Sequence, residues 1–114
     1  MVKFATLTVA FFISQFAFAH GDHPPRIAKC VAKECTESEI RDAASSAVKA
    51  VAQRDPKKSS WASAKLEKVE KRQFKKGSEW VAVFTDESKP KAEQSLYVFI
   101  TLDGYLNGSN FTGQ

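Results

Sequence analysis

The sequence predicts an α+β fold in which one amphipathic helix packs on a four-stranded antiparallel meander. The segment that begins at residue 37 places apolar side chains at helical spacing directly after a capping box. Three later runs, at 64–74, 79–85 and 94–102, are rich in β-forming residues and are separated by polar turns. A fourth strand is expected at 105–111. This order of one helix followed by four strands favours a single compact domain.

The first 19 residues have the pattern of a cleaved secretory signal peptide. One charge, Lys3, precedes an apolar run at 4–13, and Ala17 and Ala19 match the small-residue rule for signal peptidase. The apolar run is shorter than the ~20 residues that a membrane-spanning helix requires, and no later segment is long enough either. We therefore expect cleavage before His20 and a protein that is periplasmic or secreted.

Cleavage leaves a small, mildly basic chain. After loss of Lys3, 16 Lys and Arg residues face 13 Asp and Glu residues in 95 positions. No groove-reading motif accompanies this charge, so we do not expect nucleic acid as a partner. We expect a monomer with a small core. In an oxidising compartment Cys30 and Cys35 are expected to form a disulfide, which would stabilise so small a domain by about 2 kcal/mol.

Residues 20–35 are predicted to be a polar tether that carries His20, His23 and the cysteine pair. Pro24-Pro25 cannot continue a helix and biases the backbone toward extended conformations. The remainder, 36–114, is predicted to be the α+β domain.

The helix is expected to begin at Glu37, because Thr36 and Glu39 form a capping box. In this motif each side chain accepts a hydrogen bond from the backbone amide of the other residue. Arg54-Asp55-Pro56 is expected to end it. The apolar stripe consists of Ile40, Ala43, Ala44, Ala47, Val48 and Val51. Because this stripe is thin and rich in alanine, the helix is expected to lie close against a flat surface.

The strands differ in the burial that their patterns predict. The segment 64–74 interleaves charged and apolar residues, which is typical of an edge strand. The segment 94–102 is apolar on both faces and is expected to be central. Leu96, Val98, Ile100 and Leu102 share one face, and Tyr97 and Phe99 share the other. Asp103-Gly104 then favours a two-residue type I′ turn into the last strand.

Six short motifs follow one another along the mature chain: His20-Gly21-Asp22-His23, Ser60-Trp61, Glu79-Trp80-Val81, Leu96-Tyr97-Val98-Phe99, Thr101-Leu102-Asp103-Gly104 and Asn110-Phe111-Thr112-Gly113. In this order they resemble a family of small secreted bacterial proteins classed only as a domain of unknown function. That domain is similar to PepSY-like modules, which are associated with inhibition or binding in the bacterial envelope. The resemblance implies a periplasmic location and brings no established activity.

The new amino terminus carries the clearest chemical feature. A free amino-terminal His20 would chelate Cu(II) through its α-amine and a ring nitrogen, with His23 as a second imidazole and Asp22 as an oxygen ligand. The alternative is that these residues form a polar spacer, because histidines on a short tail make a poorly preorganised site. A combined site with Cys30 and Cys35 would suit zinc or Cu(I), but the disulfide competes with it.

Catalysis finds little support in the sequence. Both histidines precede the folded domain, so a serine or cysteine nucleophile there lacks a nearby imidazole base, and we expect no enzyme. A thiol redox protein is a third hypothesis, because Cys35 directly precedes a helix amino terminus, where a thiolate is favoured. The absence of a C-x-x-C motif argues against it.

One helix cannot cover both faces of a four-stranded sheet. Trp61, Tyr97, Tyr105 and Asn107 are therefore candidates for an exposed partner surface, with core packing as the alternative for the aromatic residues. We expect a non-catalytic module that binds a metal ion, with copper as the best candidate, or a peptide. The alternative is a PepSY-like inhibitor of an envelope protein that binds no metal.

Overall fold

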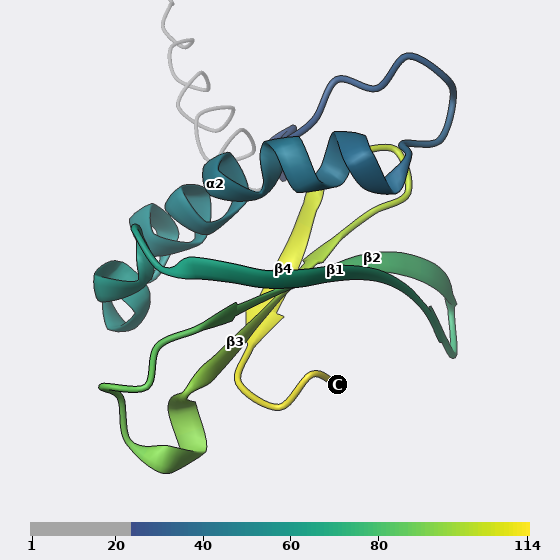
Figure 1. Ribbon diagram of the computed structural model, residues 1–114. Helices are drawn as coiled ribbons and strands as arrows, with labels where there is room; N and C mark the ends of the chain where they lie inside the picture. Colours follow the sequence, from purple (N-terminus) through teal and green to yellow (C-terminus); the bar gives the residue numbers. More distant parts are fainter. Residues whose placement is uncertain (1–23) are drawn as a thin grey trace, which may run out of the picture.

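The computed structural model describes residues 24–114. Its elements are α2 (Glu37–Arg54), the 3-10 helix η3 (Pro56–Trp61), β1 (Lys65–Phe74), β2 (Gly77–Thr85), the 3-10 turn η4 (Lys91–Glu93), β3 (Ser95–Ile100) and β4 (Leu106–Asn110). The strands form one antiparallel sheet in the order β1-β2-β3-β4, and α2 lies across one face of it (Figure 1). The predicted α+β meander is confirmed. Within residues 24–114, no helix is long and apolar enough to cross a membrane.

Local hydrogen bonds set both ends of α2 where the sequence predicted them. The amide of Glu39 donates to the Thr36 hydroxyl at 3.2 Å, and the amide of Thr36 donates to the Glu39 carboxylate at 2.9 Å. At the other end, the amide of Asp55 donates to the carbonyl of Val51 at 3.0 Å. The Asp55 carboxylate then accepts from the amide of Lys57 at 3.0 Å and starts η3.

The main core lies between α2 and the sheet. It includes Ile40, Ala47, Val48, Ala82, Phe84, Leu96, Val98 and Ile100, none of which is more than 1% exposed. Small side chains on both layers, Ala47 in α2 and Ala82 in β2, are fully buried. The alanine-rich stripe of α2 therefore packs close to the sheet, as predicted.

Trp61 belongs to this core. Its side chain is 2% exposed, and the ring of Phe111 packs against it with centroids 6.0 Å apart. The prediction that Trp61 contributes to an exposed partner surface is therefore wrong. The physical reason is η3, which packs against α2 and places the indole of Trp61 in the main core.

The segment before α2 is attached to the sheet, in contrast to the free tether expected from its composition. The amides of Ile27 and Ala28 donate to the carbonyl of Gly104 at 2.7 and 3.1 Å. The amide of Leu106 donates to the carbonyl of Pro25 at 2.9 Å. From Pro25 onward this segment therefore lies along the β3–β4 hairpin as part of the fold.

The β3–β4 hairpin closes differently from the predicted two-residue type I′ turn. The amide of Gly104 donates to the carbonyl of Thr101 at 2.9 Å, and the amide of Thr101 donates to the carbonyl of Tyr105 at 2.8 Å. Three residues therefore lie in the loop, with Gly104 at φ +98°. The Thr101 hydroxyl, which accepts from the amide of Tyr105 at 2.9 Å, stabilises the longer loop.

Candidate functional site

The sheet face opposite α2 carries a second, smaller apolar cluster. Val81, Val83 and Phe99 are at most 9% exposed, and Phe74 and Tyr97 pack against them. The two-sided burial predicted for the central strand is thus confirmed. In Figure 1 α2 lies on the other side of the sheet, so these side chains are covered mainly by neighbours on their own face.

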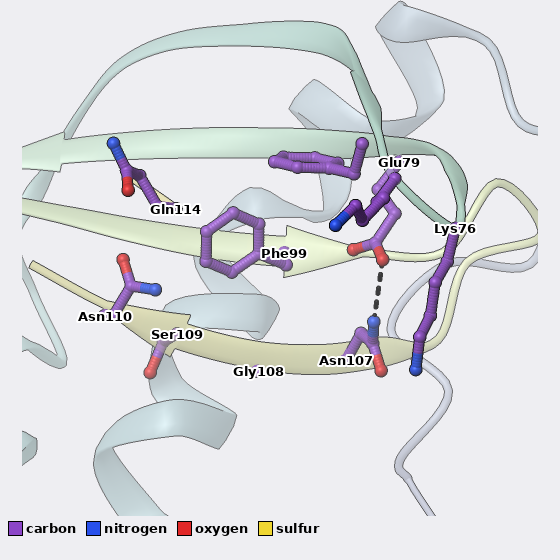
Figure 2. A pocket seen from close by; sticks show the side chains of 10 residues that line it. Lys76, Glu79, Phe99, Asn107, Gly108, Ser109, Asn110 and Gln114 are labelled. Atoms are coloured by element: carbon purple, nitrogen blue, oxygen red, sulfur yellow. Dashed lines mark hydrogen bonds between the residues drawn. The ribbon is translucent and has the colours of Figure 1, made fainter. Parts of the chain in front are cut away.

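A groove of about 480 Å³ lies on this face, between the β1–β2 hairpin and β4 (Figure 2). Phe99 in β3 lines it, and the residue opposite Phe99 in β4 is Gly108. Because glycine has no side chain, the ring has no cross-strand partner on that side. A β-carbon built on Gly108 would meet no atom within 4 Å. The groove is therefore open above the backbone of β4.

The ring of Phe74 forms one apolar wall of the groove. It meets Phe99 edge to face, with centroids 5.8 Å apart and planes at 78°. Edge-to-face packing is a preferred geometry of aromatic pairs, so the two rings hold each other in place. The floor and one wall of the groove are consequently apolar.

One end of the groove is polar. The side-chain amide of Asn107 donates to the Glu79 carboxylate at 2.9 Å, which links β4 to β2 (Figure 2). Lys75 and Lys76 come from the β1–β2 turn and line the same groove. Within residues 24–114, no ion pair within 4.0 Å involves Glu79, Lys75 or Lys76. Among the side chains that line it, the groove therefore contains one carboxylate and two ammonium groups that are not neutralised by ion pairs of the described chain.

The neighbouring part of the open face is closed by charged side chains and by the turn after β4. Arg72 is hydrogen-bonded to Glu70 and donates to the carbonyl of Gly113 at 3.2 Å. The Arg72 hydrogen bond holds the pKa of Glu70 below its ordinary value. The guanidinium also lies 5.5 Å from the ring centroid of Tyr97.

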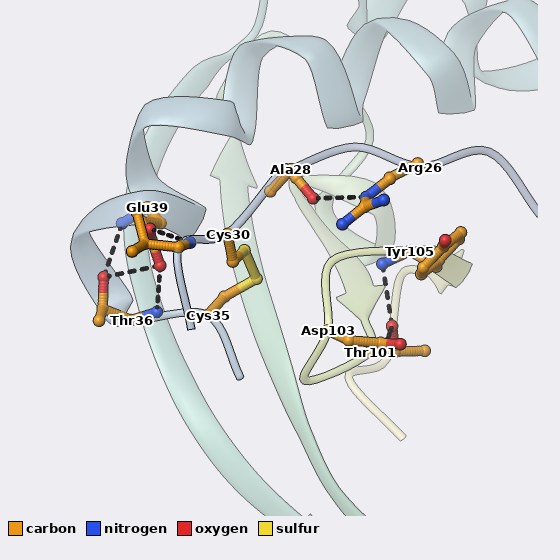
Figure 3. Close-up of a disulfide and its surroundings, with 10 residues drawn as sticks. Arg26, Ala28, Cys30, Cys35, Thr36, Glu39, Thr101, Asp103 and Tyr105 are labelled. Atoms are coloured by element: carbon orange, nitrogen blue, oxygen red, sulfur yellow. Dashed lines mark hydrogen bonds between the residues drawn. A yellow bond between two sulfur atoms is a disulfide. The ribbon is translucent and has the colours of Figure 1, made fainter. Parts of the chain in front are cut away.

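The Cys30–Cys35 disulfide predicted from the sequence is present, with α-carbons 5.0 Å apart (Figure 3). Glu39 lies beside it and fastens the loop to the start of α2, because its carboxylate accepts from the amides of Val31 and Thr36. These backbone hydrogen bonds lower the pKa of Glu39. Glu39 and the two sulfur atoms lie within 4.8 Å of one another, but the sulfurs are bonded to each other and offer no thiolate to a metal.

A comparison with known protein families relates the whole chain, residues 1–114, to a family of unknown function. The chain belongs to the DUF6488 family. This agrees with the resemblance seen in its short motifs. No curated protein and no solved structure matches the chain.

The structure brings one of the four predicted partner residues of the DUF6488 chain into the groove. Asn107 lies there and is exposed. Tyr97 is covered by Arg72 and by the turn at Gly113, where an added β-carbon would lie 3.0 Å from the Tyr97 ring. Tyr105 is half-buried, and its ring lies 5.5 Å from the guanidinium of Arg26 (Figure 3). The four residues, including the buried Trp61, therefore form no continuous strip.

Sequence reasoning missed Phe74, Glu79 and Gly108 as groove residues. Gly108 lines the groove only because a register shift places Phe99 opposite Gly108 while the next residue, Ile100, pairs with Leu106. This irregularity has no local signature in the sequence. The predicted metal ligands His20, Asp22 and His23 lie outside the described residues.

Proposed function

We propose that this DUF6488 chain is a non-catalytic binding module of the bacterial envelope whose ligand occupies the groove on the open sheet face. The observation that supports the proposal is the combination of an apolar floor at Phe99 and Gly108 with polar groups at one end. Small-ligand sites have this composition, and a groove of about 480 Å³ falls within their usual range of about 300–1,000 Å³.

The chemistry of the groove favours binding over catalysis. Its polar groups are amides, a carboxylate, a hydroxyl and lysine ammonium groups. The two histidines of the sequence precede the described residues, and both cysteines are in the disulfide. Nucleophilic chemistry would require a base beside the Ser109 hydroxyl, but this hydroxyl accepts from the ammonium of Lys58 at 3.1 Å, and that ammonium is ion-paired with Asp55. Acid–base chemistry would require Glu79 or a lysine in a strongly perturbed environment, whereas both lysines of the β1–β2 turn are exposed.

An envelope location is supported by two independent features. The first 19 residues have the composition of a signal peptide, and the Cys30–Cys35 disulfide is of a kind that persists in oxidising compartments. A direct measurement is the mass of the protein recovered from the periplasm or the medium. We expect a chain that starts at His20.

The groove proposal is tested by two-dimensional ¹H–¹⁵N NMR of the oxidised protein during titration with a library of amino acids and short peptides. We expect at least one member to shift the amides of Asn107, Gly108 and Phe99, with smaller shifts in Glu79→Gln. The matched control is Glu87→Gln, which removes the same charge from an exposed position outside the groove. If no member shifts groove amides, or if the shifts lie elsewhere, the proposal is wrong.

A second candidate function is Cu(II) binding at the mature amino terminus through His20, with His23 and Asp22. The attachment of Pro25 to Leu106 favours it, because the anchor limits how far the terminus lies from the sheet. Five residues from His20 extend at most roughly 18 Å. A metal held by His20 would therefore lie within roughly 18 Å of the β4 edge of the domain.

Copper binding is tested on protein that begins at His20, beside His20→Ala and a version with one extra residue ahead of His20. Both changes remove part of the amine–imidazole chelate. We expect tight Cu(II) binding to be lost in both variants. Equally weak binding in all three proteins would make residues 20–23 a spacer.

A further inference from the structure

The charges of the groove narrow the class of ligand that it accepts. Figure 2 shows Glu79, Asn107 and Lys76 at one end of the groove, with Phe99 beside them. A ligand that carried only a positive charge would be repelled by the lysines, and a ligand that carried only a negative charge would be repelled by Glu79. The arrangement favours a ligand with an ammonium and a carboxylate close together.

The hydrogen bonding of Asn107 also favours a ligand that carries an ammonium group. Its amide nitrogen donates to Glu79, which orients the carboxylate and leaves the Asn107 side-chain oxygen as an acceptor. An ammonium group has three donors and can donate to the Glu79 carboxylate, whose position the hydrogen bond from Asn107 sets. The ammonium groups of Lys75 and Lys76 would meet a ligand carboxylate at the same end.

The apolar part of the groove fits a planar ring. No atom lies within 4 Å of the position that a β-carbon of Gly108 would occupy, and Phe74 and Phe99 already form an edge-to-face pair that a third ring can extend. The distance from ring to charges is short, because Phe99, Gly108 and Asn107 are direct neighbours in the sheet.

We propose that the groove binds a free aromatic α-amino acid. The ring would pack on Phe99 over the backbone of Gly108, the ammonium would contact Glu79, and the carboxylate would contact the lysines of the β1–β2 turn. An α-amino acid carries both charges on one carbon, which matches their convergence at one end of the groove. This inference rests on the groove being the binding site proposed above.

The test compares four probes by NMR titration of the oxidised protein. L-phenylalanine is the full ligand, L-alanine lacks the ring, phenethylamine lacks the carboxylate, and 3-phenylpropionate lacks the ammonium. We expect L-phenylalanine to shift the groove amides and each of the other three to bind roughly tenfold more weakly, the effect of losing one charge-assisted contact or the ring.

Two variants test which charged group of the ligand each charged residue of the groove contacts. Glu79→Gln should weaken binding of L-phenylalanine and should not weaken binding of 3-phenylpropionate, because that probe has no ammonium for Glu79 and is repelled by its carboxylate. The double variant Lys75→Met, Lys76→Met should weaken binding of L-phenylalanine and should not weaken binding of phenethylamine, because that probe has no carboxylate for the lysines and its ammonium is repelled by them. Matched controls are Glu87→Gln and the double variant Lys57→Met, Lys91→Met, which change the same charges at exposed positions outside the groove. Urea unfolding midpoints establish that the variants are folded.

The outcomes separate the ligand class from the binding function. If 3-phenylpropionate or phenethylamine binds as tightly as L-phenylalanine, or if the groove variants behave like their controls, the inference is overturned. If library peptides shift the groove amides and L-phenylalanine does not, the ligand class is wrong while the groove remains a binding site. If nothing shifts the groove amides, both proposals fall.

Discussion

Replacing Gly104 by alanine is expected to weaken the attachment of the amino-terminal segment to the β3–β4 hairpin. The carbonyl of Gly104 accepts from the amides of Ile27 and Ala28, and its backbone has φ +98°. A β-carbon at this position would clash with the carbonyl oxygen of Ala28 and lie 3.3 Å from its side chain. The variant must therefore accept backbone strain and move the segment away.

The magnitude follows from these two effects. A non-glycine residue at positive φ costs about 1–2 kcal/mol. Each of the two backbone hydrogen bonds contributes about 1 kcal/mol net, and the clash separates their partners. We expect Gly104→Ala to lower the free energy of unfolding by about 3–4 kcal/mol, a large part of the 5–15 kcal/mol typical of a small domain.

Gly77→Ala is the matched control. Gly77 also has positive φ, +135°, but a β-carbon there would meet no atom within 4 Å. Its expected cost is the strain alone, about 1–2 kcal/mol. The difference between the two variants, about 2 kcal/mol, therefore measures the attachment of the segment to Gly104.

Urea unfolding of the oxidised proteins measures both costs, and amide hydrogen exchange at Ile27 and Ala28 reports the attachment directly. We expect faster exchange of these two amides in Gly104→Ala only. Equal costs in Gly104→Ala and Gly77→Ala, with unchanged exchange, would refute the conclusion that this segment is part of the fold.

Two further predictions concern the region around the disulfide. Reduction of the Cys30–Cys35 disulfide, which joins residues 5 positions apart, is expected to lower the free energy of unfolding by about 2 kcal/mol. Urea titrations with and without reductant measure this change, and an unchanged midpoint would contradict it. The amides of Val31 and Thr36 hold the pKa of Glu39 below its ordinary value of 4.5. The ionised Glu39 carboxylate therefore stabilises the folded state at pH values above 4.5, and this stabilisation is lost as the pH falls through the lower pKa of the folded state. The decrease in the free energy of unfolding between pH 7 and pH 3, measured by urea titration, should thus be smaller in Glu39→Gln than in wild type or in Glu87→Gln. An equal decrease in all three proteins would argue against the role given to Glu39.

Several features followed from the sequence because they depend on residues close together in the chain. The start of α2 is set by Thr36 and Glu39, three positions apart, and the buried side of α2 by a repeat of three and four. The two-sided burial of β3 followed from its alternation of Leu96, Tyr97 and Val98. The cysteine pairing was predictable because two cysteines in an expected oxidising compartment have no other partner.

The binding groove and the packing of the amino-terminal segment were decided only by the tertiary structure. Phe99 and Gly108 become opposite residues through a three-residue loop and a register shift, and each changes which side chains share a face. Trp61 is buried because η3 turns back onto α2, and Pro25 is held by the backbone amide of Leu106, which has no side-chain signature. The sequence by itself determined the elements, their buried faces and the disulfide, since these depend on local hydrogen bonds and periodicity. Contacts between distant backbone groups determined the site, and the sequence pattern carries no record of them.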